Sequence, residues 1–139
     1  MFHPRTVEQY MTRGVHAVRS TESLRAAHEV MRSYQIRHLP VIEHGVLVGV
    51  VSLRDLILVQ GLPGVDACRL TVAEAMTHHP YAVAPETDVR EIANEMRKRR
   101  LGCAVVVRGG ALVGIFTTVD ALRAFTQTVD VLEIASRQA

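Results

Sequence analysis

Mostly apolar side chains recur at helical spacing in two separate stretches of this 139-residue chain. In each stretch one face carries residues at positions i, i+3, i+4 and i+7, a pattern typical of an amphipathic helix packed on one side. These faces consist of Leu24, Ala27, His28 and Met31 in the first stretch and of Val89, Ile92, Ala93 and Met96 in the second. The spacing predicts one helix from about Ser23 to Tyr34 and a second helix that repeats it.

A β-hairpin is predicted after each of these helices. Short runs rich in β-branched residues flank turns that contain glycine, which readily adopts the positive φ that a hairpin turn needs. The predicted strand pairs are His38–Ile42 with Val46–Val51 and Cys103–Val107 with Ala111–Phe116. A further helix should follow each hairpin, starting at Ser52 or Thr117 and ending near Gln60 or Phe125.

The segments before the two amphipathic helices also match each other. Thr6–Gln9 and Thr71–Glu74 have the form of a capping box, which predicts a short helix at each position. Extended pieces, Val15–Val18 and Tyr81–Val83, come next. The last residues, 126–139, are expected to lengthen the final helix and to carry a narrow apolar stripe that can pack on a partner.

The chain is an internal duplication. A shift of 65 residues aligns Thr6–Leu56 with Thr71–Ala121 without a gap, and 15 of the 51 pairs are identical. About 3 identities would arise by chance. A copy of this size is marginally stable alone, so the halves are expected to stabilise each other as a pseudo-symmetric pair. We predict a first unit at 1–60, a linker with glycine and proline at 61–70, a second unit at 71–126 and a tail at 127–139.

The same short motif stands where each hairpin ends and the next helix begins. It has a glycine, then Ser52 and Asp55 in the first copy, or Thr117 and Asp120 in the second. One interpretation is a capping box, in which hydroxyl and acid only satisfy backbone N–H groups. The other is a ligand site, because a helix N-terminus attracts phosphate, the acid can accept from ribose hydroxyls, and glycine leaves room for a ring or sugar. The pattern alone leaves both interpretations open.

These motifs recur in order and in duplicate, and they resemble a tandem pair of cystathionine-beta-synthase (CBS) domains. The resemblance covers Thr6 to about Phe125. It implies an α/β fold in which two β-α-β-β-α domains pack sheet to sheet about a pseudo-dyad and leave two clefts. In this family such clefts bind adenosine-containing ligands, namely AMP, ADP, ATP or S-adenosylmethionine. The resemblance therefore implies a regulatory binding module for one of these ligands.

Candidate ligand-binding residues come from strand ends and helix starts in both copies. They are Val15, His16, Ala17, Arg37, His38, Pro40, Ser52, Arg54, Asp55, Pro80, Tyr81, Ala82, Cys103, Thr117, Thr118 and Asp120. Arg37 and His38 match a position where the family often places basic side chains near phosphate. The second copy has Gly102 and Cys103 there. We therefore expect an anionic nucleotide to occupy the clefts unequally, and the sequence does not assign Arg37 to one of them.

Charge and composition narrow the function further. The net charge is +2, and the one basic cluster, Arg97–Arg100, is interpreted as a solvated helix end that complements the helix dipole, so no nucleic acid partner is expected. Cys68 and Cys103 lack metal or redox spacing, and no pair among the seven histidines has metal-ligand spacing beside an acid. With no signal peptide and no run of ~20 apolar residues, a cytoplasmic protein without a membrane partner is expected.

No nucleophile stands beside a plausible base and no catalytic motif occurs, so we predict no enzyme, no metal site and no catalytic cofactor. The predicted function is regulatory binding, with the bound state passed to an effector protein that the sequence does not identify. A homodimer is expected, with helices near Leu24–Met31 and Leu56–Val59, or their counterparts, at the interface. The alternative is a structural dimerisation module with empty clefts, in which Asp55 and Asp120 only cap helices.

Overall fold

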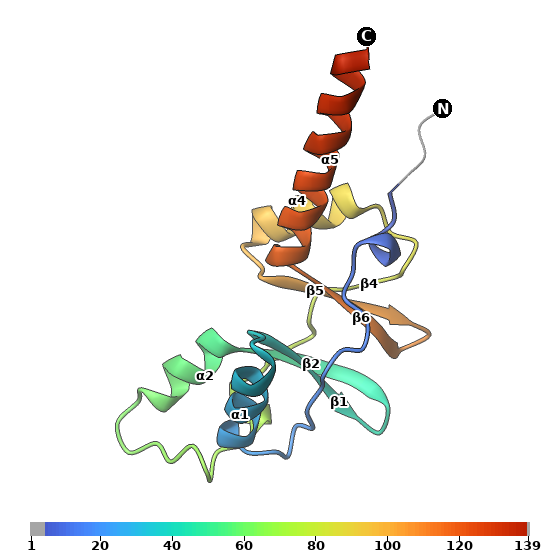
Figure 1. Ribbon diagram of the computed structural model, residues 1–139. Helices are drawn as coiled ribbons and strands as arrows, with labels where there is room; N and C mark the ends of the chain where they lie inside the picture. Colours follow the sequence, from blue (N-terminus) through green and yellow to red (C-terminus); the bar gives the residue numbers. More distant parts are fainter. Residues whose placement is uncertain (1–4, 139) are drawn as a thin grey trace.

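Two stacked α/β halves make up the computed structural model, which describes residues 5–138 (Figure 1). The sheets of the two halves face each other in the middle, and the helices lie on the outer sides. The helices are η1 Val7–Gln9, α1 Leu24–Tyr34, α2 Leu53–Gln60, α3 Val72–Ala75, α4 Val89–Arg99 and α5 Thr118–Gln138. The strands are β1 His38–Glu43, β2 Val46–Ser52, β3 Thr77–His78, β4 Ala82–Val83, β5 Cys103–Arg108 and β6 Ala111–Thr117. The predicted α/β class and sheet-to-sheet arrangement are confirmed.

The pairing of strands follows the duplication. One sheet has the order β1-β2-β3 and the other β4-β5-β6, and both predicted hairpins are antiparallel. Each hairpin has an irregularity at the same place, after Val41 and after Val106. β4 runs parallel to β5, and an isolated parallel bridge joins Val18 to Val41 at the equivalent place in the first half. The pseudo-symmetry predicted from the 65-residue shift is therefore present in the backbone.

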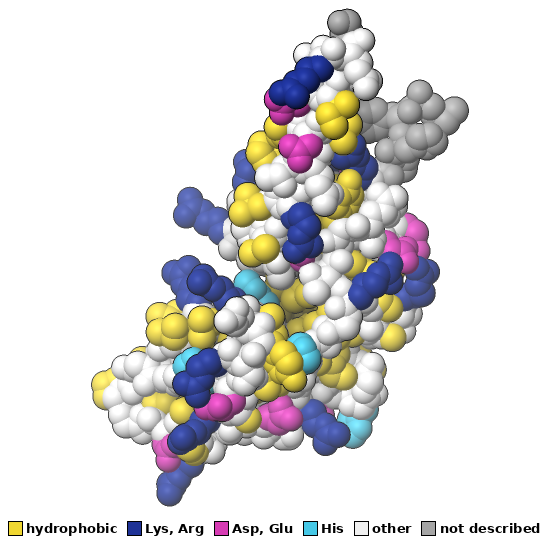
Figure 2. All heavy atoms as spheres, viewed as in Figure 1, with side chains coloured by type: hydrophobic (Ala, Val, Ile, Leu, Met, Phe, Trp, Pro, Cys, Tyr) yellow, Lys and Arg dark blue, Asp and Glu magenta, His cyan; other side chains and the backbone are white. Residues whose placement is uncertain are grey.

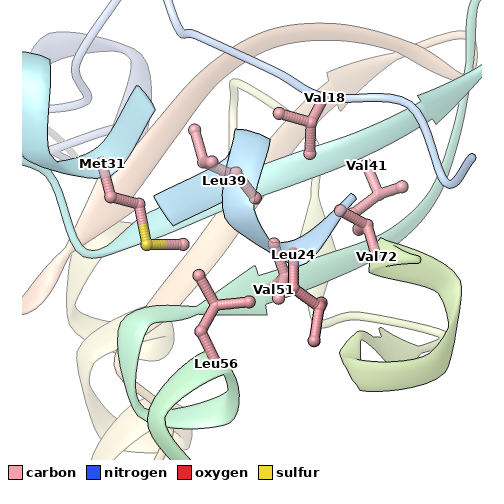
Figure 3. Packing of buried hydrophobic residues seen from close by; sticks show 9 residues of the cluster. Val18, Leu24, Met31, Leu39, Val41, Val51, Leu56 and Val72 are labelled. Atoms are coloured by element: carbon pink, nitrogen blue, oxygen red, sulfur yellow. The ribbon is translucent and has the colours of Figure 1, made fainter. Parts of the chain in front are cut away.

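The two halves exchange their leading segments. β3 comes from the start of the second repeat and pairs with β2 of the first, while Thr12 bridges Ile115 in β6. Val7 and Met11 lie in the core of the second half, and Val72 lies in the core of the first. Figure 3 shows the first core, which comprises Val18, Leu24, Ala27, Met31, Leu39, Val41, Val51, Leu56 and Val72. Each core thus contains a turn from the other repeat.

The predicted capping boxes at the two leading segments do not form. Neither Thr6 nor Thr71 makes a side-chain cap bond. Instead the first helical residues, Val7 and Val72, donate their N–H groups to backbone carbonyls of the other repeat at 2.9 and 2.8 Å. Because the exchange already satisfies these amides and the helices are only 3 and 4 residues long, a side-chain cap has no donor left to serve.

The remaining helix and hairpin predictions agree with the structure, whereas in the predicted extended piece Val15–Val18 only Val18 forms a β-bridge. Ser23 caps α1 by accepting from the N–H of Ala26 at 3.0 Å, and both hairpins occupy the expected residues. The tail continues the last helix as far as Gln138, so α5 projects well beyond its sheet (Figure 1); residue 139 lies outside the described residues. Within residues 5–138, no helix has the length and apolar character to cross a membrane.

Candidate functional site

The first motif forms its capping box at the start of α2. The Oγ of Ser52 accepts from the N–H of Asp55 at 3.1 Å, and Asp55 Oδ2 accepts from the N–H of Ser52 at 2.9 Å. No residue in the described part of the chain donates to Asp55 Oδ1. Asp55 is half-buried. Capping therefore uses one carboxylate oxygen and leaves the other available to a ligand.

Asp55 lines a cavity of about 860 Å³ between the two halves, a volume within the usual range for small-molecule sites of roughly 300–1,000 Å³. Residues of β1, β2, α2, segment 77–81, the end of α4 and the start of β5 surround it. Figure 2 shows basic side chains gathered where the halves meet on the α2 side. This cavity is the candidate site, and we call it the Asp55 cleft.

Half of the candidate residues line the Asp55 cleft. They are Arg37, His38, Ser52, Arg54, Asp55, Pro80, Tyr81 and Cys103. The structure thus places Arg37, which the sequence left unassigned, in this cleft. Pro40 is buried in the sheet and Ala82 pairs with Val105 in β4, and neither lines the cavity.

Sequence reasoning missed several residues of the cleft. They include Thr77, His79, Arg99 and Arg100. Arg99 and Arg100 are solvent-exposed at the end of α4, as predicted, but they also face this cavity from the other half. The guanidinium of Arg99 lies 5.3 Å from the ring centroid of Tyr81 in a cation–π contact. Burial raises the pKa of Tyr81.

The half-buried His38 and the buried Cys103 are titratable groups of the cleft whose pKa values are shifted. Burial lowers the pKa of His38 below its ordinary 6.5, Asp55 opposes this shift and Arg37 adds to it. The His38 imidazole lies against Gly102, where a Cβ would come within 2.5 Å of its Nε2, so a larger residue at position 102 would require the imidazole to move. Burial raises the pKa of Cys103 to about 12, and its thiol stays protonated at neutral pH. Cys103 therefore packs as a small hydrophobic residue, as predicted.

The second motif has the same form and different partners. Asp120 is 2% exposed. Its Oδ2 accepts from the N–H and hydroxyl of Thr117 at 2.9 and 3.2 Å. Its Oδ1 accepts from Thr12 Oγ1 at 3.0 Å and from Arg123 at 3.2 Å. Both oxygens of Asp120 are thus engaged, and neighbouring Thr118 donates its hydroxyl to the carbonyl of Gly102.

The extended segment of the first repeat is also engaged. His16 stacks on Tyr34, with ring centroids 3.6 Å apart and planes at 18°. These residues stand 65 positions before Tyr81 and Arg99, so two stacked rings occupy the place where the other half has a ring beneath a guanidinium. One face of His16, which is a candidate ligand-binding residue between Val15 and Ala17, is already covered.

The glycines of the two motifs do not leave room for a ligand, contrary to the expectation from the sequence. A Cβ on Gly49 would lie 2.7 Å from the sulfur of Met76, and one on Gly114 would overlap the sulfur of Met11. The methionine of each exchanged segment fills this space. The repeated Met and the repeated Gly are therefore partners in packing.

The fold and its two junctions define a pseudo-symmetric tandem module, and comparison with known proteins gives its family. The CBS domain matches residues 7–61 and 72–127. The chain belongs to the CBS-domain family and carries a tandem pair of these domains.

Relatives and solved structures agree with this assignment. The chain is 32% identical over 114 residues to inosine-5'-monophosphate dehydrogenase of Korarchaeum cryptofilum, covering 81% of this chain but only 23% of that enzyme. A Vibrio cholerae protein assigned to acetoin utilization, AcuB, is similar with a TM-score of 0.81 and 33% identity, covering 97% of this chain and 98% of that one. CBSX2 in complex with AMP has a TM-score of 0.78 and 29% identity, with coverage of 88% and 97%.

Proposed function

We propose that the protein is a regulatory module that binds an adenosine-containing ligand in the Asp55 cleft and passes its bound state to a partner protein, without catalysis. The observation that carries this proposal is the unused Oδ1 of Asp55, at a helix N-terminus, inside a cavity of about 860 Å³. The positive end of the α2 helix dipole favours a phosphate. The carboxylate suits ribose hydroxyls, and the Tyr81 ring lies in the same cavity with the Arg99 guanidinium over it. The similarity to an AMP complex supports this ligand class.

We infer one high-affinity site per chain. A nucleotide at the second junction would have to displace Thr12 or Arg123 from Asp120, and to compete with Tyr34 for His16. No such displacement is needed at Asp55. AMP, ADP, ATP and S-adenosylmethionine are the candidate ligands.

A thermal-shift panel tests the proposal directly. A ligand that binds only the folded state stabilises it by RT ln(1 + [L]/Kd), which is about 2.7 kcal/mol at a hundredfold excess over Kd. We expect at least one of the four candidates to raise Tm. If none does at millimolar concentration, the structural dimerisation module is the better description, because the capping box of Asp55 is complete without a ligand.

Arg37 gives a sharper test of the ligand's charge. We expect Arg37→Ala to weaken AMP or ATP about tenfold or more and adenosine far less, because only the phosphate gains a charge-assisted bond. Raising the salt concentration should narrow this difference. Arg19→Ala, at an exposed arginine outside the cavity, is the control. Calorimetric titration measures the affinities of both variants. An equal loss of affinity for adenosine and AMP in Arg37→Ala would make Arg37 a structural residue.

We also propose a homodimer. The apolar residues of α1, among them Leu24 and Met31, are buried in the protein's own core, which leaves α2 and α5 as the better interface elements. Ile57 and Leu58 on α2 are 56% and 61% exposed. The exposed stripe of α5 has the alternating spacing of three and four residues that joins helices in coiled coils, and it consists of Leu122, Phe125, Val129 and Leu132.

A further inference from the structure

Four arginines from both halves line the Asp55 cleft. Arg37 stands at the start of β1, Arg54 in the first turn of α2, and Arg99 and Arg100 at the end of α4. The carboxylate of Asp55 is the single acidic group among the described residues that line the cavity. The cleft therefore has a strong excess of positive charge.

Among residues 5–138, no carboxylate forms an ion pair with any of these four guanidinium groups. Elsewhere in residues 5–138, arginine–carboxylate ion pairs are formed by Arg13, Arg32, Arg69, Arg108, Arg123 and Arg137. None of the four cleft arginines forms one within the same residues. Like charges gathered in one cleft repel each other, and they concentrate anions there.

The duplication supplies an internal comparison. The residues 65 positions away from Arg37, Arg54, Arg99 and Arg100 are Gly102, Val119, Tyr34 and Gln35, and all four are neutral. Arg100 and Gln35 even share the left-handed backbone conformation, with φ of 55° and 54°. The same fold forms in the other half without any of these charges. The fold therefore does not require a positive charge at any of these four positions.

The charge count favours more than one phosphate. Four guanidinium groups and one carboxylate give the cleft a formal charge of 4 − 1 = +3, with histidines neutral. A phosphate monoester carries about −2 near neutral pH, and each further phosphate of a nucleotide adds roughly one more negative charge. S-adenosylmethionine has no phosphate and carries a cationic sulfonium. A di- or triphosphate therefore matches the cleft best.

The four arginines form two pairs, one on each half of the protein. Arg37 lies beside the Ser52 junction, since its carbonyl accepts from the N–H of Leu53 at 2.8 Å, and Arg54 follows in the same turn. Arg99 and Arg100 reach the cleft from the other half. A phosphate at the α2 N-terminus would meet the first pair, which leaves the second pair for the phosphates beyond it.

We propose that the Asp55 cleft selects nucleoside di- and triphosphates over monophosphates, and that Arg99 and Arg100 supply the charge for the additional phosphates. This inference rests on the proposed function. The phosphate chain then contacts both halves at once, so the bound state stiffens their relative arrangement. Such stiffening is a means by which the module can report the ligand to a partner.

The experiment compares the wild-type chain with a double variant, Arg99→Tyr with Arg100→Gln, which installs the neutral residues that the first repeat has at the equivalent positions. Adenosine, AMP, ADP and ATP are titrated by calorimetry in EDTA, so that the nucleotides keep their full charge. We expect ATP to bind the wild type at least tenfold more tightly than AMP. The double variant should lose most of this preference while its AMP affinity changes less than about threefold. Arg97→Gln, on the same helix end but outside the cavity, should leave the ATP-to-AMP ratio unchanged.

Equal binding of ATP and AMP to the wild type, or an equal loss of both in the double variant, would overturn the inference and leave the adenosine site intact. Titration with inorganic tripolyphosphate distinguishes a failure of this inference from a failure of the proposed adenosine site. If it raises the Tm of the wild type but not of the double variant, and adenosine and AMP do not bind, the polyanion site stands and the proposed adenosine site fails. The near-wild-type AMP affinity of the double variant also shows that it is folded.

Discussion

Asp55 and Asp120 occupy the same position of the same motif, yet one keeps a free oxygen and the other does not. The difference comes from single residues. Three positions after Asp120 stands Arg123, which donates to it, whereas three positions after Asp55 stands Leu58. Thr12 also donates to Asp120, and its counterpart Thr77 makes no such bond to Asp55. The motif therefore fixes the cap, and its neighbours decide whether a ligand can use the acid.

Asparagine variants should separate these roles. Asp55→Asn keeps an N-cap that is nearly as good but loses a charge-assisted acceptor, so we expect adenosine ligands to bind about ten- to a hundredfold more weakly with little change in the free energy of unfolding. Asp120→Asn leaves buried donors imperfectly paired and should cost about 1–3 kcal/mol of stability without a comparable loss of affinity. Calorimetric titration and urea unfolding measure the two effects. Unchanged affinity with lost stability in Asp55→Asn would reduce Asp55 to a cap.

His38 should give the cleft a pH dependence. Burial lowers its pKa in the folded protein below 6.5, so the unfolded chain binds the proton more readily. Its contribution to stability is therefore present above about pH 6.5 and is lost as pH falls through the lowered pKa of the folded state.

A bound phosphate favours the protonated imidazole, so AMP affinity should rise as the pH falls below 6.5. Removing the titrating group with His38→Gln should flatten this rise, while His28→Gln, on α1 outside the cleft, should not. Calorimetric titration of AMP from pH 5 to 8 provides the measurement. An identical profile for His38→Gln and the wild type would assign the effect to another group.

Helices and hairpins could be predicted from the sequence because each is set by local periodicity and turn residues. Ser23 and the glycine turns show this directly, since their hydrogen bonds and φ angles are decided within a few residues. The exchange of leading segments could not be predicted in this way. Met11-Thr12 and Met76-Thr77 are the same dipeptide, so each would fit the glycine of either sheet. Only the path of the chain decides between the two sheets.

Because of the packing of these segments, Gly49 and Gly114 should differ in how well they tolerate a larger residue. A Cβ at Gly49 would lie 2.8 Å from the backbone carbonyl of Thr77 as well as against Met76, whereas at Gly114 its three nearest atoms would all belong to the flexible side chain of Met11. Gly49→Ala should therefore destabilise the protein by about 1–3 kcal/mol, and Gly114→Ala by less. Because Gly49→Ala displaces β3, it should also weaken ligand binding at the Asp55 cleft. Urea unfolding of both variants is the test, and a larger loss for Gly114→Ala would contradict this packing argument.

At the scale of the whole molecule, the Asp55 cleft combines the Ser52–Asp55 motif of the first repeat with two arginines of the second repeat. Ser52 and Asp55 could be identified because they form one local motif. Arg99 and Arg100 could not, because they stand at a helix end where basic residues are expected for a local reason and reach the cleft only through the stacking of the halves. A comparison of the two copies at these positions finds Tyr34 and Gln35, and this difference is the signal in the sequence that could have indicated a special role for the two arginines.

A homodimer is expected because α5 projects beyond the sheet of its own half (Figure 1) and exposes apolar side chains. Phe125 and Leu132 face a groove lined also by η1 and α4 residues, but Leu122 and Val129 on the same stripe do not line it and are 59% and 42% exposed. We expect sedimentation at micromolar concentration to give twice the 15.4 kDa of the chain. Leu122→Asp with Val129→Asp should shift the protein to the monomer, because charges at the centre of a helix pair lose solvation. Gln127→Asp, across the helix from the stripe, should not. A wild type that sediments only as a monomer, with and without ATP, would refute the dimer.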